Sequence, residues 1–113
     1  MKKQFRIKKN EEFSRILSLK RVKSSRLFVV YHAPKREENA RVGISVSKKL
    51  GDAVTRNRVK RQLRMMCLSV IDFEKDPMDL VIIVRKPFLE GSFQDNKNDL
   101  EKLIKKNIIK QYE

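Results

Sequence analysis

Several components that catalytic and metal-binding proteins use are scarce in this 113-residue chain. It has one cysteine, Cys67, one histidine, His32, and three glycines. A single cysteine excludes an internal disulfide, and these two residues are too few for a Cys/His zinc site. With so few glycines there is no Walker-type phosphate loop. The cysteine usage fits a reducing compartment, and we expect a cytoplasmic protein.

Long apolar runs are absent as well. The longest, LVIIV at residues 80–84, is far too short to cross a bilayer, and the N-terminal MKKQFRIKKNEEF lacks the apolar region of a secretory signal. No carboxylate cluster suggests a Mg²⁺ site, and neither Ser45 nor Ser47 has the context of an activated nucleophile. We therefore expect no membrane partner, no metal or other cofactor held by the protein, and no catalytic residue within it.

Positive charge is what the chain has in excess. Lys and Arg number 28 against 14 Asp and Glu, which gives a formal net charge of +14. This excess cannot be neutralised within the chain, so the expected partner is a polyanion. Nucleic acid is the first candidate, and an anionic membrane surface is a distant second. The 40% hydrophobic content predicts one globular domain over residues 1–113 with a modest core.

Hydrophobic periodicity predicts an α+β fold in which helices pack on a small mixed sheet. In the first half of the chain, a helix is expected over residues 8–20, with Asn10 as its cap. Strands are expected over residues 26–32 and 41–49, paired as an antiparallel hairpin, with an optional short strand near residues 21–24.

The second half of the chain predicts a basic helix that ends near Ile71 and is capped by Asp52 or Thr55. Residues 80–86, LVIIVRK, are apolar on both faces, as expected for a central strand covered on each side. A last helix spans residues 99–112. The element order is then α-β-β-(β)-α-β-α, in which the bracketed strand is the optional one.

The stretch RNRVKRQLR, residues 56–64, concentrates positive charge in the predicted basic helix. Wound at 3.6 residues per turn, this helix presents an apolar stripe and a separate basic arc, while Arg58 points to a third side. The stripe consists of Val59, Leu63, Met66, Cys67 and Val70. The arc consists of Asn57, Lys60, Arg61 and Arg64. Because such dense like charges repel one another, we expect the arc to bind a phosphate backbone; a solvated basic face is the alternative.

Single-stranded RNA is bound by aromatic stacking in a positive groove, and Phe13 and Tyr31 are the candidates for stacking. Phe13 shares the apolar face of the first helix with Ile16 and Leu17, so core packing is the simpler interpretation of it. Strand alternation puts Tyr31 on the face opposite Phe28, and there core packing and base stacking remain equally open.

Residues 41–64, RVGISVSKKLGDAVTRNRVKRQLR, resemble the signature of the bacterial ribonuclease P protein subunit. In that family a strand end rich in Ser and Lys and a Gly-x-Ala-Val turn lead into an Arg-Asn-Arg helix. The matching residues here are Ser47, Lys48, Lys49, Gly51, Ala53, Val54, Arg56, Asn57 and Arg58. RIKKNEEF, RLFVVY and LVIIVRKP resemble other elements of the family, so the resemblance covers nearly the whole chain.

The resemblance implies an accessory subunit of ribonuclease P, the ribonucleoprotein that removes the 5′ leader of precursor tRNA. A catalytic RNA with Mg²⁺ performs the hydrolysis and one protein joins it, broadening the substrate range. The family also joins its parallel strands through the basic helix by a left-handed crossover, against the usual right-handed rule.

The resemblance also implies which residues bind RNA. The single-stranded leader lies in a cleft between the first helix and the sheet, at Phe13, Leu17, Val29 and Tyr31. Many members have a second aromatic residue where this chain has Leu17. The positions implied for contact with the catalytic RNA are Lys48, Lys49, Arg56, Asn57, Arg58, Lys60, Arg61 and Arg64.

Three other functions are weighed against this one. A small ribosomal protein shares the basic charge and the α+β pattern, but it has no reason to distinguish precursor from mature tRNA. A major-groove DNA-binding protein normally brings a helix-turn-helix pair or a dimerisation zipper, and neither pattern is visible. A stand-alone nuclease is disfavoured by the missing catalytic groups.

Overall fold

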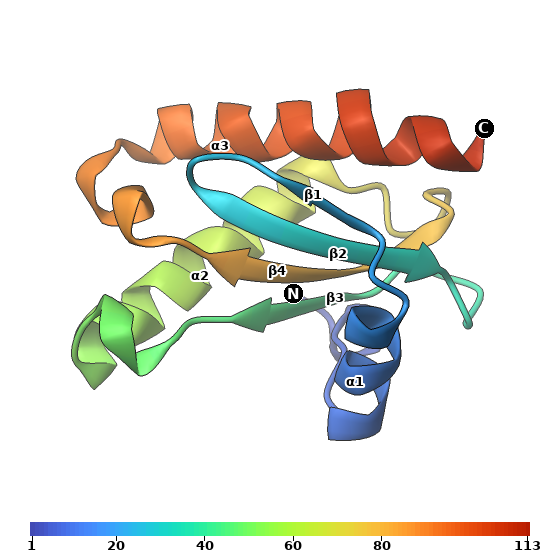
Figure 1. Cartoon of the computed structure of the whole chain (residues 1–113), viewed down its shortest axis with the longest axis horizontal. Coiled ribbons are helices and arrows are strands. Elements are labelled where there is room, and N and C mark those ends of the chain that lie inside the picture. Colours follow the sequence, from blue (N-terminus) through green and yellow to red (C-terminus); the bar gives the residue numbers. More distant parts are fainter.

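The structure is a computed structural model that describes residues 1–113 as a four-stranded sheet with helices on both faces (Figure 1). The strands are β1 (Val22–Ser24), β2 (Phe28–Pro34), β3 (Val42–Ser45) and β4 (Met78–Val84). The helices are α1 (Asn10–Ser18), α2 (Ala53–Val70) and α3 (Phe93–Lys102), and α3 continues as a π-helical segment (Leu103–Ile108) and a 3₁₀ turn (Ile109–Tyr112). Further 3₁₀ helices are η1 (Lys3–Phe5), η2 (Lys48–Leu50) and η3 (Lys86–Glu90). The predicted α+β class is confirmed.

β4 is a central strand of the sheet, whose order is β1-β2-β4-β3. It pairs antiparallel with β2 and parallel with β3, and all of it except Ile83 is buried. The prediction of a central strand is therefore confirmed, although the strand spans Met78–Val84 and not the predicted residues 80–86. The predicted hairpin between residues 26–32 and 41–49 is wrong, because β4 lies between them. A strand that is apolar on both faces loses most water contact in the middle of a sheet.

The structure also shows the short first strand and the residues that cap the first two α-helices. The short strand expected near residues 21–24 is present as β1, the first strand of the chain, and pairs antiparallel with β2. α1 includes Asn10 as its first residue and has Lys9 at the cap position, so the prediction that Asn10 caps it is wrong. Asp52 caps α2, since its carboxylate accepts a hydrogen bond from the backbone N–H of Thr55 over 2.8 Å.

Two other elements have different bounds from those predicted. β3 ends at Ser45, because the Ser47 hydroxyl accepts a hydrogen bond from the backbone N–H of Lys49 over 3.1 Å and starts the η2 turn. The last helix begins well before the predicted residues 99–112. Ser92 caps it in the same way, by accepting from the backbone N–H of Asp95 over 3.1 Å.

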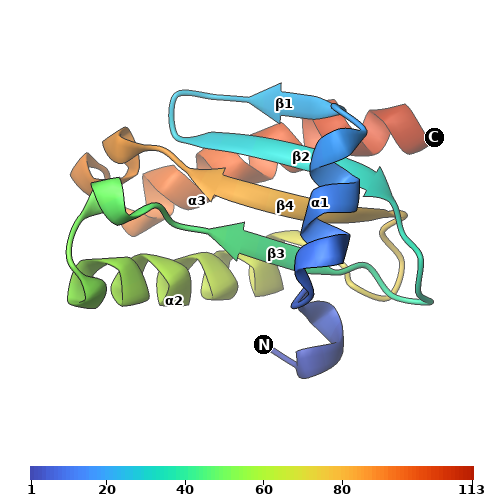
Figure 2. The ribbon, with the colours of Figure 1, turned by 60° about the horizontal axis from the view of Figure 1, so that its bottom comes forward.

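The connection from β3 through α2 to β4 is left-handed. In Figure 2 both strands point to the left and β4 lies above β3, while α1 crosses in front of the sheet. α2 packs on the face opposite α1, so the chain passes behind the sheet as it moves up from β3 to β4. This is the crossover that the family resemblance implies and that general chain chirality disfavours.

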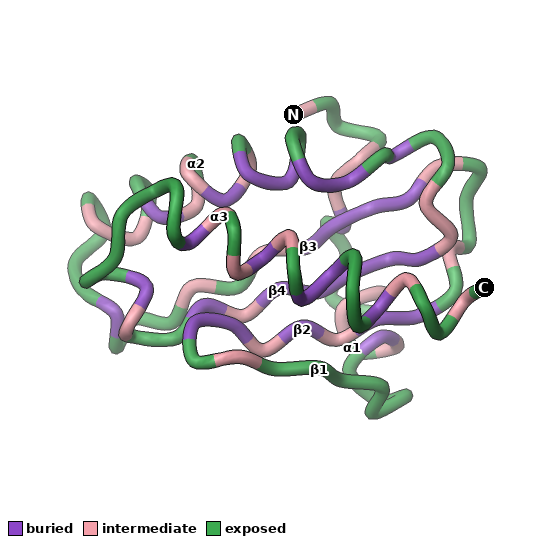
Figure 3. The backbone as a smooth tube through the Cα atoms, turned by 90° about the horizontal axis from the view of Figure 1, so that it is seen from above, coloured by how far each residue is buried: buried purple, intermediate pink, exposed green.

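The two faces of the sheet are covered unequally. α2 and the C-terminal helix bury the main core on one face, which includes Phe28, Val30, Leu80 and Ile82 of the alternate strand positions. α1 covers a small cluster on the other face. Figure 3 shows the buried turns of α2 and α3 facing the strands and their exposed turns outside. None of the helices combines the length and apolar character needed to cross a bilayer.

Candidate nucleic-acid interface

α2 has the two faces that its periodicity predicts. The apolar stripe is buried against the sheet and consists of Val59, Leu63, Met66, Cys67 and Val70. At the start of the helix, the pKa of the Asp52 carboxyl is lowered, because Thr55 donates hydrogen bonds to the charged form and Arg56 lies nearby. The negative charge of this cap also interacts favourably with the positive, N-terminal end of the helix dipole. The stripe therefore fixes which side of α2 faces solvent, and the cap fixes where the helix begins.

The predicted contacts to the catalytic RNA lie on α2 and on the adjoining η2 turn. The exposed ones are Lys48, Lys49, Asn57, Arg58 and Arg61, and the half-buried ones are Arg56, Lys60 and Arg64. None of them takes part in an ion pair of the structure. Apart from Asp52 at the start of α2, this surface therefore carries its positive charge without a close carboxylate partner, as a phosphate-binding surface requires.

A second candidate surface is the sheet face on which α1 lies. Phe13 lies so close to Gly43 of β3 that a Cβ there would be 2.5 Å from the ring atom Cζ. Phe13 and Tyr31 of β2 both pack against the small cluster that includes the buried residues Ile16 and Val81, and both are half-buried. Each side chain is therefore partly packed against the protein and partly accessible to solvent. Core packing and base stacking are thus compatible at both positions.

The other two leader positions lie on the same face. Val29 of β2 is half-buried and is paired with Ile83 of β4, which packs against the same cluster as Phe13. Leu17 follows Phe13 by one helical turn and is 36% exposed. The fold therefore places Phe13, Leu17, Val29 and Tyr31, from α1 and β2, on the sheet face that carries α1, and this surface is called the groove below.

A hollow of about 120 Å³ connects the two surfaces. It is lined by Phe13 of α1, by Lys60 and Arg64 of α2, and by Arg6 of the N-terminal segment, with apolar side chains at its base. The surface around Phe13 and the basic face of α2 therefore meet at this hollow.

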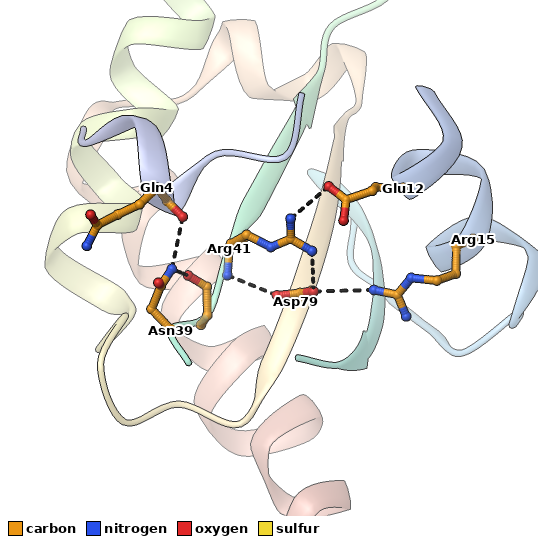
Figure 4. A network of polar contacts seen from close by, with 7 residues as sticks. Gln4, Glu12, Arg15, Asn39, Arg41 and Asp79 are labelled. Atoms are coloured by element: carbon orange, nitrogen blue, oxygen red, sulfur yellow. Dashed lines mark hydrogen bonds and ion pairs between the residues drawn. The ribbon is translucent and has the colours of Figure 1, made fainter. Parts of the chain in front are cut away.

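A buried ion network holds α1 against the sheet (Figure 4). The Asp79 carboxylate is fully buried on β4 and accepts from the Arg41 guanidinium at 3.1 Å, from the Arg41 backbone N–H at 3.1 Å and from Arg15 of α1 at 3.3 Å. Arg41 also donates to Glu12 of α1 at 2.7 Å. Glu12 and Arg15 flank Phe13 in the chain, so the network fixes one wall of the groove. The sequence signal for it, an Asp inside an apolar strand, is visible only in retrospect.

The network makes stability depend on pH through Glu12. The pKa of this carboxyl is lowered from its ordinary 4.5, chiefly because Arg41 donates a hydrogen bond to the charged form. Its contribution to stability is therefore present above about pH 4.5 and lost as the pH falls through the lowered value. We expect Glu12→Gln to be less stable than the wild type at neutral pH but equally stable in strong acid. Urea unfolding at both pH values measures this, and an equal loss at both would contradict it.

Two cations outside the predicted set lie at the same end of the sheet. Arg85 and Lys86 follow β4 directly, and Lys48 and Lys49 come shortly after the end of β3. Because β3 and β4 are parallel neighbours, their carboxyl ends meet at one edge. Arg85 and Lys86 are absent from the predicted set because a β2–β3 hairpin places the end of β4 elsewhere.

The residues that most often carry chemistry lie in the core, away from these surfaces. His32 lies 2.7 Å from the Tyr112 hydroxyl through its Nδ1 atom, and burial lowers its pKa. Burial also raises the pKa of the Cys67 thiol to about 12. No group of three or more His, Cys, Asp or Glu side chains is placed to hold a metal ion. What the exposed surfaces offer is cations and aromatic rings.

Comparison with known proteins decides the family. The model of the family Ribonuclease P matches residues 1–107 of the chain. The chain belongs to the ribonuclease P protein family. It is 42% identical over 111 residues to the ribonuclease P protein component of Bacillus cereus, covering 97% of this chain and 96% of that protein.

Solved structures of the family share the fold. The RNase P protein of Staphylococcus aureus superposes with a TM-score of 0.81 at 35% identity, over 93% of this chain and 96% of that one. That of Thermotoga maritima gives a TM-score of 0.77 at 28% identity, over 89% of this chain and 96% of that one. Membership makes the chain a component of a tRNA-processing ribonucleoprotein enzyme.

Proposed function

We propose that this chain joins one catalytic RNA to form a bacterial ribonuclease P and binds the 5′ leader of precursor tRNA. The RNA performs the hydrolysis with Mg²⁺ in the cytoplasm, and the protein supplies binding. The catalytic RNA lies along α2 and η2, on the predicted set Lys48, Lys49, Arg56, Asn57, Arg58, Lys60, Arg61 and Arg64. The leader lies on Phe13, Leu17, Val29 and Tyr31.

The hollow shared by Phe13, Lys60 and Arg64 supports this proposal best. Single-stranded RNA needs rings for its bases and cations for its phosphates along one path, and base stacking on an aromatic side chain is worth about 1–3 kcal/mol. Mature tRNA has no leader and makes none of these contacts. The groove therefore favours precursor over product, and with Leu17 in place of a second aromatic, stacking rests on Phe13 and Tyr31.

The decisive experiment is cleavage of precursor tRNA at low Mg²⁺ by a bacterial ribonuclease P RNA, with and without this protein. We expect cleavage to require the RNA, and the protein to stimulate it more for a long-leader substrate than for one with a very short leader. Protein alone serves as the control. No stimulation would favour a structural RNA-binding role of the ribosomal type, and cleavage by protein alone would refute the assignment of catalysis to the RNA.

The leader groove is tested by Tyr31→Ala. Losing one stacking contact worth about 1–3 kcal/mol is expected to reduce the preference for precursor over mature tRNA about 5- to 150-fold. Phe93→Ala is the matched control, because Phe93 is a 37% exposed aromatic side chain on α3 and outside the groove. Binding of both tRNA forms to the reconstituted holoenzyme measures the preference. An unchanged preference in Tyr31→Ala would remove this residue from the leader site.

A further inference from the structure

A second hollow lies on the other side of α2, away from the leader groove. It measures about 200 Å³ and lies between α2 and the η3 turn. Its lining consists of Arg58, Val59, Gln62, Phe88, Leu89 and Gly91. Apart from Arg58 of the basic face and Val59 of the buried stripe, none of these residues has been described above.

The η3 wall of this hollow is held in place by buried contacts. Asn96 of α3 is buried, and its side-chain amide donates to the carbonyl of Phe88 over 3.0 Å. A Cβ at Gly91 would lie 2.6 Å from the Oδ1 atom of Asn96, so glycine is required for this close approach. The Phe88 ring packs edge-on against Phe28 with 5.7 Å between centroids. The hollow is therefore preformed, which reduces the entropy lost when a ligand binds.

The chemistry of the lining combines one cation, one amide and apolar surface. Arg58 and Gln62 are one helical turn apart, so their side chains lie next to each other. Arg58 is exposed and takes part in none of the ion pairs, and its planar guanidinium can stack on a ring or pair with a phosphate. The Gln62 amide offers both a donor and an acceptor. Leu89 is 38% exposed and adds an apolar surface.

The size of the hollow limits what it holds. Pockets that enclose a drug-sized ligand measure about 300–1,000 Å³, so this smaller hollow suits a single planar ring. An amide that both donates and accepts matches the edge of a nucleobase, and sequence-specific RNA recognition uses unstacked bases held in this manner. The hollow borders the basic face of α2 through Arg58, so an RNA bound on that face lies next to the hollow.

We propose that this hollow binds one unstacked nucleobase of the catalytic RNA, an inference that rests on the proposed function. The base inserts beside Leu89, its edge hydrogen-bonds to the amide of Gln62, and the adjoining phosphate pairs with Arg58. Arg58 then differs in role from Arg61 and Arg64, because it anchors a specific nucleotide and not only a stretch of backbone.

The test is the affinity for a bacterial ribonuclease P RNA, measured over a range of salt concentrations. Gln62→Ala is expected to bind about 5- to 150-fold more weakly with an unchanged salt slope, because it removes a base contact. Arg58→Ala is expected to lower both the affinity and the slope, the latter by about one unit, because it removes a phosphate contact. Gln94→Ala changes a glutamine on the surface of α3 and serves as the control. Thermal unfolding checks that each variant is folded.

Chemical probing of the RNA bases supplies a second readout. We expect one unpaired base to be protected by the wild-type protein and to become reactive again with Gln62→Ala. If the wild type binds the RNA but Gln62→Ala matches it in affinity and in protection, the nucleobase site is refuted while the proposed function stands. If the wild type itself does not bind the RNA, the proposed function fails and this inference fails with it.

Discussion

Replacing Asp79 by Asn is expected to lower the free energy of unfolding by at most about 3–5 kcal/mol, the usual cost of breaking a buried ion pair, because Arg41 loses one of its two carboxylate partners and keeps only Glu12. The Asp79 side chain is fully buried, and the Arg41 side chain opposite it is only 8% exposed. The amide oxygen of an Asn at this position can still accept from the Arg41 backbone N–H. Its NH₂ group then faces the guanidiniums of Arg41 and Arg15, which are donors themselves. Because a domain of this size is stable by only about 5–15 kcal/mol, this loss is a large part of the total.

Urea unfolding followed by circular dichroism measures this effect. Glu37→Gln is the matched control, because it removes one negative charge from an exposed loop and is expected to change stability by less than about 0.5 kcal/mol. If Asp79→Asn unfolds at the same urea concentration as the wild type, the network is not what holds α1.

Affinity for the catalytic RNA is expected to fall about 10³- to 10⁵-fold when the salt concentration rises from about 50 to 200 mM, if about six to ten phosphates are contacted. The cations available for such contacts are Lys48, Lys49, Arg56, Arg58, Lys60, Arg61, Arg64, Arg85 and Lys86. The release of cations condensed on the RNA supplies the driving force, and this release gains less entropy when the salt concentration in solution is already high, so added salt weakens binding. A flat response to salt would refute the electrostatic account of this surface.

Single substitutions resolve the salt dependence into residues. Arg61 is exposed on α2 and has no ion pair, so Arg61→Ala is expected to reduce the salt slope by about one unit while leaving thermal stability almost unchanged. Lys110→Ala removes an exposed lysine near the C-terminus and is expected to leave the slope unchanged. A collapse of thermal stability in Arg61→Ala would show that this residue is structural.

The parts of the fold that local patterns define were predicted correctly. α2 follows its 3.6-residue period, and every member of its predicted apolar stripe is buried. β4 is apolar on both faces, which indicated a central strand, and the ordered motifs of residues 41–64 indicated the family. Each of these features is a property of consecutive residues. None depends on which distant segment lies alongside.

The pairing of the strands could not be predicted from such local patterns. β2 and β3 are successive strands, so a hairpin was the natural prediction, yet β4 separates them. The hydrogen bonds that a strand offers are the same for any partner, and the choice depends on burying the most apolar strand. The same choice places Arg85 and Lys86 near the end of β3, so the error in pairing hid these cations.

The sequence by itself determined the charge of this protein, its apolar and basic helix faces, and the family to which it belongs, because composition and periodicity are local. Only the tertiary structure decided how the surfaces join. Arg15 and Asp79 are 64 positions apart, and their ion pair helps hold α1 where Phe13 lines one hollow with Lys60 and Arg64. Such contacts depend on the packing of whole elements, which no stretch of neighbouring residues specifies.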